Sequence, residues 1–485
     1  MKQCRECKEI YLITSEDRKF YQKISVPEPT LCPNCRQQRR YAWRNERTFY
    51  KRKCDLCQRK IISIYSSDKP YKVYCQDCWW SDKWDPLDYA REFNFHEPFF
   101  TQFKKLMLAV PRLALVSKNS ENSEYANHSG NNKNVYLSSV VWYSENIYYS
   151  NWVSHSQDCV DCTYLLDTCE LCYELITSSN CYICQYSNLL FNCCNCKFCY
   201  DMRGCENCLL CSNLRNQKYC IKNKQYSEKE YTQYVETCHG MSLQNQYNNL
   251  LSNNSIHRNI IDNSENCSGN NIFHAKNCQQ CFDISNMENS KYAVSALDMK
   301  DSMDIYHCGY NCDLLYECHA MVGSHNCKFC HFSYHNYDLE YCDSCHNSHD
   351  LFGCVGIKRN NFCILNKPYS ENDYKKIKTK IINQMLQTKE YGEFFPSALS
   401  PFGYSETVGQ FYMPKDKIKD YHDKNNISQD LPRCQTCCRN FKFIKQELEF
   451  YKKMNISVPR YCPNCRYLAR MHQRQPRKLS DHLVC

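Results

Sequence analysis

The sequence has little glycine, little proline and no long apolar run. Only 11 Gly and 15 Pro occur among 485 residues, which argues against a flexible linker protein. The longest apolar run, 106–116, is interrupted by Pro111 and Arg112 and is too short to cross a bilayer. The first residues, MKQCRECKEIYLIT, lack the apolar core of a signal peptide. We therefore expect a cytoplasmic protein with no membrane partner.

Common catalytic motifs are missing as well. The sequence contains no Gly-rich phosphate loop, no His-Glu-x-x-His motif and no nucleophile elbow. We therefore predict no catalytic residue and favour a non-enzymatic protein. An enzyme remains an alternative, because solenoid enzymes assemble carboxylates from neighbouring coils.

Cysteine is the residue that the chain has in abundance, with 41 copies beside 39 Tyr and 22 Phe. A cytosolic protein keeps its thiols reduced, so metal binding or buried thiols are expected rather than a disulfide framework. The aromatic content argues against global disorder.

Positive charge is concentrated at both ends of the chain. Residues 1–60 hold 16 Lys and Arg against 7 Asp and Glu, and residues 430–485 hold 12 against 4. Since the whole chain carries +9, the stretch between these ends carries −8. Such an asymmetry suggests basic modules for an anionic partner and an acidic middle that could bind protein.

Two internal duplications organise the chain. At an offset of 430, residues 4–36 match residues 434–466 without a gap, and both segments end in CPNCR. At an offset of 143, residues 133–231 match residues 276–374, also without a gap. The order is therefore a finger-like module, two copies of a core and the same module again.

Within each core copy, Asn or Asp recurs about every twelve residues, as at Asn134, Asn146 and Asp158. Short runs rich in Tyr, Cys, Leu, Ile or Ser follow each of them. Short strands at such regular spacing predict all-β structure, and a repeat that cannot bury its own apolar face must stack on its neighbours. We favour a β-solenoid over a β-sandwich, because the hairpin signals Asn-Gly and Asp-Gly are missing.

The predicted fold is mainly β, with a duplicated Asn/Cys-rich β-solenoid-like core flanked by treble-clef or zinc-ribbon modules and with few helices. The expected segments are zinc module 1 (1–50), zinc module 2 (51–84), a helical connector (85–118), core copy 1 (119–231), a connector (232–275), core copy 2 (276–374), a helix (370–391), a linker (392–430) and zinc module 3 (431–485).

Three sets of paired Cys-x2-Cys knuckles have the spacing of zinc sites. Two residues between thiolates let one tight turn present both sulfurs to one ion, and two such turns complete a tetrahedron. Each set supplies four thiolates and leaves no open position, so we expect about three structural Zn²⁺ ions. The predicted ligands are Cys4, Cys7, Cys32 and Cys35; Cys54, Cys57, Cys75 and Cys78; and Cys434, Cys437, Cys462 and Cys465.

A stripe of arginines follows the second knuckle in modules 1 and 3. Spacings of 4, 4 and 3 residues place four guanidiniums on one face of a helix. Like charges at this spacing weaken a helix, whereas phosphates accept forked guanidinium hydrogen bonds. The stripe therefore favours RNA or DNA contact over a merely solvated basic face. Its members are Arg36, Arg40, Arg44 and Arg47, aligned with Arg466, Arg470, Arg474 and Arg477.

Module 2 ends differently, in WWSDKWDP, with Trp79, Trp80 and Trp84 close together. We interpret these side chains as a hydrophobic plug between module and core rather than as a ligand site.

Most core cysteines are interpreted as inward-facing side chains that bind no metal. Only five cysteine positions persist in both copies, and most of the others face Ser or an aliphatic residue, as Cys159 faces Ser302 and Cys172 faces Leu315. A thiolate ligand cannot be replaced by Leu, whereas a buried thiol behaves as a small hydrophobe. Extra zinc sites in the core remain the alternative.

With CPNCR, VYCQDCWWSDKWDP and the Asn/Cys core laid out, the chain resembles uncharacterised long cysteine-rich zinc-ribbon proteins of uncultured small-genome bacteria. The resemblance extends over nearly the whole length. It implies no activity, since that group has none established.

The leading hypothesis is a zinc protein whose basic modules contact nucleic acid and whose rigid acidic solenoid is a scaffold or protein-docking surface. The alternatives are a structural self-assembling protein and a carbohydrate-active or other enzyme on the solenoid groove. The acidic positions shared by both copies are the only catalytic candidates for such an enzyme: Asp158 and Asp301, Asp161 and Asp304, and Glu174 and Glu317. The sequence does not determine an oligomeric state.

Overall fold

The computed structural model describes residues 1–237, 240–253, 259–414, 431–474 and 477. Residue contacts divide the chain into two units. Unit 1 consists of Met1–Ala114, Arg258–Pro414 and Pro476–Cys485, and unit 2 of Leu115–His257 and Lys415–Gln475. Unit 1 therefore combines modules 1 and 2 with core copy 2, whereas unit 2 combines module 3 with core copy 1.

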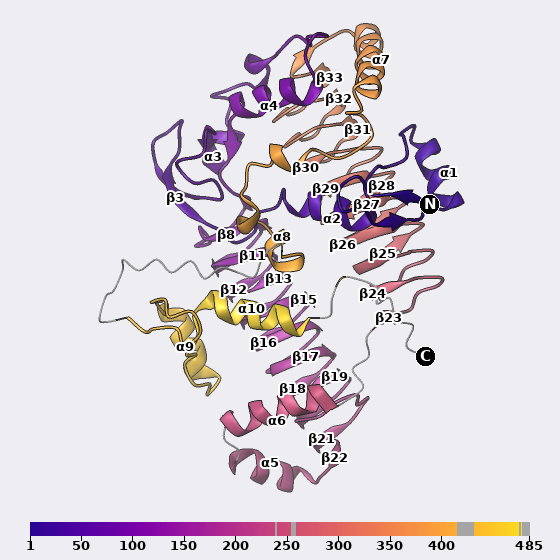
Figure 1. The fold of residues 1–485 in the computed structure, drawn as a ribbon. Coiled ribbons are helices and arrows are strands. Elements are labelled where there is room, and N and C mark those ends of the chain that lie inside the picture. Colours follow the sequence, from indigo (N-terminus) through magenta and orange to yellow (C-terminus); the bar gives the residue numbers. More distant parts are fainter. Residues whose placement is uncertain (238–239, 254–258, 415–430, 475–476, 478–485) are drawn as a thin grey trace. The chain divides into compact units, whose positions relative to one another are not determined.

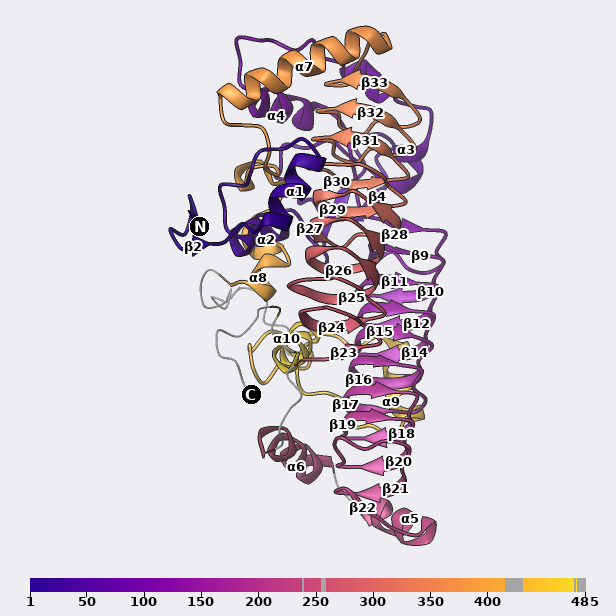
Figure 2. The same ribbon diagram turned by 90° about the vertical axis from the view of Figure 1, so that its right-hand side faces the viewer.

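Core copy 1 is a β-solenoid whose strands stack as parallel rungs (Figures 1 and 2). Among its described strand pairs, only β21 with β22 is antiparallel. The strands are β7 (Ser117–Lys118), β8 (Ala126–Asn127), β9 (Ser129–Gly130), β10 (Lys133–Tyr136), β11 (Ser138–Trp142), β12 (Glu145–Tyr148), β13 (Asn151–Ser154), β14 (Gln157–Val160), β15 (Thr163–Asp167), β16 (Glu170–Ser179), β17 (Gln185–Phe191), β18 (Cys194–Lys197), β19 (Tyr200–Arg203), β20 (Glu206–Leu209), β21 (Lys218–Ile221) and β22 (Lys224–Gln225).

Core copy 2, in unit 1, is built in the same way and also ends in an antiparallel pair, β33 with β34. Its strands are β23 (Ile261–Asp262), β24 (Gly269–Phe273), β25 (Cys281–Glu288), β26 (Lys291–Lys300), β27 (Met303–Tyr306), β28 (Gly309–Asp313), β29 (Tyr316–Val322), β30 (His331–Tyr334), β31 (Tyr337–Glu340), β32 (His349–Phe352), β33 (Asn361–Ile364) and β34 (Lys367–Pro368).

Most coils of the solenoid contain twelve residues, and the coil in which Ile261 pairs with Ile272 contains eleven. Lys133 pairs with Glu145, and Glu145 pairs with Gln157. One coil in each copy contains thirteen, since Gln157 pairs with Glu170 and Met303 pairs with Tyr316. The parallel pairing confirms the predicted solenoid and excludes the β-sandwich, because a sandwich is built from antiparallel sheets.

The corners of the coil explain the recurrent asparagines. Every third residue takes a positive φ, as at Asn134 (55°), Leu137 (45°), Val140 (56°) and Tyr143 (53°), and Asn and Asp tolerate this left-handed conformation better than most residues. Stacked asparagines also bind one another, since the Asn134 amide donates to the Asn146 side chain 12 residues later at 2.9 Å. The twelve-residue Asn period thus marks one corner of successive coils.

One residue in three points into the solenoid, and these inward positions form the core of each copy. At such a position the Cys159 thiol donates to the Gln157 carbonyl at 3.2 Å, and the Ser302 hydroxyl makes the equivalent bond to Lys300 at 2.7 Å. A thiol and a hydroxyl therefore fill the same place with the same bond. The interpretation of most core cysteines as inward-facing side chains is confirmed, and Cys194 is a partly exposed exception.

Helices are few, as predicted. In the described part of the chain the α-helices are α1 (Ser15–Lys23), α2 (Pro33–Tyr41), α3 (Gln76–Trp80), α4 (Phe99–Ala109), α5 (Glu228–Thr237), α6 (Gly240–Asn253), α7 (Glu371–Gln387), α8 (Gly409–Tyr412), α9 (Lys445–Lys453) and α10 (Pro463–Gln473). Short 3-10 helices cover Pro86–Tyr89, Ser397–Leu399 and Tyr404–Glu406.

The helix expected over 370–391 is confirmed as α7, and the Ser370 hydroxyl caps it by accepting from the Asp373 backbone N–H. The connector expected over 85–118 is helical only in part, since β6 (Arg112–Leu113) follows α4. The linker expected over 392–430 lies outside the described residues from 415 onward. No helix among the described residues is both long and apolar enough to span a membrane.

Candidate metal centres and docking sites

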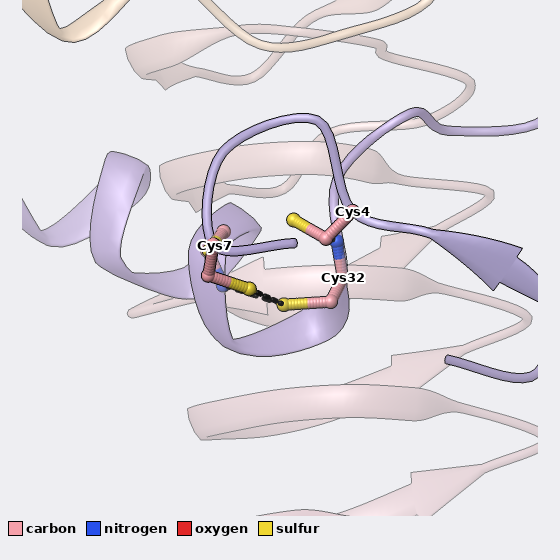
Figure 3. Close-up of side chains that lie close together, drawn as sticks. Cys4, Cys7 and Cys32 are labelled. Carbon is pink, nitrogen blue, oxygen red and sulfur yellow. Dashed lines mark hydrogen bonds between the residues drawn. The ribbon is translucent and has the colours of Figure 1, made fainter. Parts of the chain in front are cut away.

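The structure brings the twelve knuckle cysteines together in three groups of four. In each group all four Sγ atoms lie within 4.8 Å of one another. The Cys7 and Cys32 sulfurs are 3.7 Å apart (Figure 3), and Cys437 and Cys462 repeat this distance. Four sulfurs bound at 2.3 Å to one tetrahedral ion lie about 3.8 Å apart. The three groups can therefore each hold a metal ion, and among the described residues no other cluster has this geometry.

Local structure favours an anionic thiolate at the first cysteine of modules 1 and 3, whereas burial raises the pKa of Cys32 and Cys462. Cys32 and Cys462 stand at the N-caps of α2 and α10, each followed by Pro at the first helical position. Although burial raises the pKa of Cys4, backbone N–H groups of Cys32 and Cys7 outweigh it and lower that pKa to about 6. The equivalent Cys434 in module 3 behaves in the same way. A thiolate is the form that binds metal.

The arginine stripe of module 1 lies buried against core copy 2. Arg36 and Arg40 bind the two oxygens of Asp304 at 2.9 and 3.1 Å. Arg39 binds Glu317 through both oxygens at 2.8 and 3.0 Å, and Arg40 adds a contact at 3.3 Å. The side chains of Asp304 and Glu317, and those of the stripe members Arg36 and Arg40, are at most 1% exposed.

Module 3 binds core copy 1, within unit 2, through the duplicate residues. Arg466 and Arg470 bind the two oxygens of Asp161 at 3.0 and 2.7 Å. Asp161 is the counterpart of Asp304 at the offset of 143, and Arg466 and Arg470 are the counterparts of Arg36 and Arg40 at the offset of 430. We refer to each aspartate together with the two arginines that bind it as an arginine clamp.

Further contacts around the arginine clamp are duplicated as well. Lys23 binds Asp301 at 3.1 Å, and its counterpart Lys453 binds Asp158 at 3.0 Å. The Tyr21 ring packs on Tyr316 with centroids 5.6 Å apart, and Tyr451 packs on Tyr173 at the same separation. The two modules therefore dock on their solenoids in the same way.

The remaining arginines of the stripe are also engaged with the protein. Arg44 is buried and binds Glu46 at 2.5 Å, and Arg47 is partly buried. Arg474 stacks on Tyr164 in unit 2 at 3.7 Å, and Arg477 binds Asp283 in unit 1 at 2.7 Å. Seven of the eight guanidiniums are thus held by carboxylates or rings of the chain itself, an arrangement that the sequence did not predict. Nucleic-acid contact through them stays a prediction.

Five of the six acidic positions considered for an enzyme belong to the same interfaces. Asp161, Asp304 and Glu317 are buried in the ion pairs described above, and Asp158 and Asp301 accept from lysines. Glu174 is the remaining member. The sequence did not predict that these acids bind the arginines, although one signal was present. The arginines are repeated at the offset of 430 and the acids at the offset of 143, and the two repeated sets have opposite charges.

The tryptophans of module 2 pack on core copy 2, in line with the predicted plug. The Trp79 ring lies 5.5 Å from the His346 ring, and Lys358 sits over Trp79 and Trp84 at 4.0 and 4.3 Å. Burial lowers the pKa of Lys358 to about 8. The cation is thus enclosed by aromatic faces, which suit a desolvated ammonium.

Comparisons with known proteins do not assign a family. No protein-family model matches the chain, and no curated protein does. Among solved structures, a protein assigned as an acetyltransferase from Desulfovibrio desulfuricans G20 is similar over 53% of this chain and 68% of its own, at 8% identity and a TM-score of 0.11. A likeness at this level supports no statement about this chain.

Proposed function

We propose that the chain is a non-enzymatic zinc protein in which Zn²⁺ fixes modules 1 and 3 on a rigid solenoid that serves as a scaffold or protein-docking surface. The observation that supports this most is the arginine clamp, which occurs in both units with the same residues. A four-thiolate site favours zinc among biological metals and leaves no position for a substrate.

In this proposal, zinc positions the two helices that carry the arginines of the clamps. Cys32 and Cys462 cap the helices that carry the clamp arginines, so the metal sets where α2 and α10 begin. Structural zinc sites contribute folding energy directly, and their modules unfold without metal. Loss of the ion should therefore release the arginines from Asp304 and Asp161.

Elemental analysis of the purified full chain tests this proposal. We expect three zinc ions per chain, and we expect Cys4→Ser with Cys7→Ser to lower the content to two while raising hydrogen exchange in α2 and in the facing strand β27. The matched change Cys159→Ser, at an inward core position, should leave the content at three. Six or more zinc ions, or iron, would contradict the proposed role of the core thiols.

Nucleic-acid contact through the eight arginines is a second proposal, retained from the charge pattern of modules 1 and 3. Since the docked arginines are engaged with carboxylates, it requires them to undock first. It therefore predicts that chelation of zinc increases, rather than abolishes, the retention of the chain on nucleic acid.

A further inference from the structure

Module 2 contains a basic β-ribbon that the arginine stripes do not involve. Strands β3 (Tyr50–Lys53) and β4 (Lys60–Ser63) pair antiparallel, with Lys51 opposite Ile62 and Lys53 opposite Lys60. Side chains alternate between the faces of a strand. Lys51 and Lys53 are accordingly exposed, as is Lys60, whereas Tyr50 and Arg52 are partly buried.

The three exposed lysines of this ribbon are not neutralised by the protein. In the described ranges, no carboxylate forms an ion pair with Lys51, Lys53 or Lys60. Two acids of the same module are engaged elsewhere: Asp55 binds Arg52 at 2.8 Å, and Asp77 binds Arg59 at 2.5 Å. Arg59 also donates to the Cys75 sulfur at 3.4 Å, so it serves the metal group.

The register makes the cluster unfavourable for folding. Lys53 and Lys60 are directly opposite each other, and like charges at this position destabilise a pair of strands. A two-stranded ribbon depends strongly on such cross-strand pairs. The arrangement is therefore better explained by an anionic partner than by stability.

We infer that the exposed face of the β3–β4 ribbon binds the phosphodiester backbone of a nucleic acid. A two-stranded ribbon fits the major groove of B-DNA, and lysine is a point charge that pairs with phosphate in any orientation. Lys51 and Lys53 are about 6.7 Å apart along the strand, roughly twice the axial spacing of phosphates on one DNA strand. Backbone contact of this kind carries no sequence preference.

Fluorescence anisotropy with the zinc-loaded full chain tests the inference, with a 20-base-pair DNA duplex in one arm and a 20-nucleotide single-stranded RNA in the other. Three phosphate contacts give a salt slope of about −2.7 on duplex and about −2.1 on a single strand. Affinity should therefore fall roughly 40-fold for DNA and roughly 20-fold for RNA between 50 and 200 mM KCl. The arm with the higher affinity identifies the source of the phosphates.

The variant K51E/K53E/K60E should abolish binding in both arms. Its matched control is K376E/K380E/K389E, which reverses three exposed lysines on or just after α7 in the same unit and should retain binding and the salt slope. Binding that survives the ribbon variant, or that the α7 variant removes equally, would overturn the inference. So would absence of binding at 50 mM KCl, or equal affinity for a 20-residue poly-glutamate.

The single change Lys60→Glu separates binding from folding. It replaces the repulsion opposite Lys53 with an attraction, so the melting temperature should stay the same or rise. The salt slope on duplex DNA should nevertheless become shallower by about one unit. Loss of binding together with a lower melting temperature would mean that the lysines serve the fold.

Discussion

The two docked modules use the same arginine clamp but differ in one cation. In unit 1, Glu317 receives Arg39 through both oxygens as well as Arg40. In unit 2, the counterpart of Arg39 is Ala469, which is exposed. Glu174, the counterpart of Glu317, therefore has no equivalent of Arg39, and among the described residues Arg470 pairs with Asp161 rather than with Glu174. The duplication preserved the clamp and varied the charge beside it.

This difference changes the electrostatics of the two sites. Burial raises the pKa of both Glu174 and Glu317, while Arg39 and Arg40 oppose the shift in Glu317. The pKa of Glu174 reaches about 7, because burial acts together with the nearby charge of Asp161. Module 1 is thus fixed by a neutralised network, whereas module 3 is fixed beside a carboxyl that titrates near neutral pH.

Removing the clamp carboxylate should have the largest effect. Asp304→Ala and Asp161→Ala each leave buried guanidiniums without their shared anion, and breaking such a buried pair costs about 3–5 kcal/mol. Urea unfolding monitored by hydrogen exchange in α2 and α10 separates the two units. We expect Asp304→Ala to expose α2, and Asp161→Ala to expose α10.

The matched control is Asp301→Ala, three residues from Asp304, where Lys23 and Asp301 are both exposed by more than a third. Exposed pairs contribute at most about 1 kcal/mol. An effect of Asp304→Ala as small as that of Asp301→Ala would show that the clamp does not hold the module.

Removing Arg39 should convert unit 1 into a copy of unit 2. Arg39→Ala removes one partner of Glu317 and the ion pair with Glu393 but leaves Arg40. We therefore expect a loss of about 1.5–3 kcal/mol, the range for a hydrogen bond to a charged group. The same measurement on Ala469→Arg should show a gain in unit 2, since the new guanidinium enters the neighbourhood of Glu174. A loss in both variants would refute the assignment of the missing cation.

The fold was more predictable from the sequence than the role of the charges. The twelve-residue Asn period reports a backbone requirement, a left-handed corner at Asn134 or Asn146, and such a requirement acts locally. The Cys-x2-Cys knuckles are equally local, because one tight turn sets both sulfurs. These features could therefore be identified one segment at a time.

The binding partners of the arginines could not be predicted from single segments in this way. Their helical spacing gives one charged face, but a charged face fits a phosphate and a buried carboxylate equally well. Only the three-dimensional arrangement shows that Arg36 meets Asp304 and that Arg466 meets Asp161. Which core copy receives which module depends on contacts between segments far apart in the sequence, and no local pattern records them.

The smallest expected effect is a difference in pH dependence between the units. Because the folded pKa of Glu174 is about 7, folded unit 2 keeps a proton that the unfolded chain loses near its ordinary value of about 4.3. The stability that this proton contributes is complete below that value and declines as pH rises through 7. Allowing for the partial exposure of Glu174, we expect roughly 1–2 kcal/mol of loss between pH 4.5 and 8.

The variant Glu174→Gln should remove this slope, because its amide does not titrate, and should make unit 2 more stable than the natural chain at pH 8 but not at pH 4.5. The same change in unit 1, Glu317→Gln, should destabilise at both pH values, since it removes the anion that Arg39 and Arg40 bind. Hydrogen exchange in α10 and α2 at the two pH values measures both effects. Equal behaviour of the two variants would mean that Ala469 in place of an arginine does not distinguish the sites.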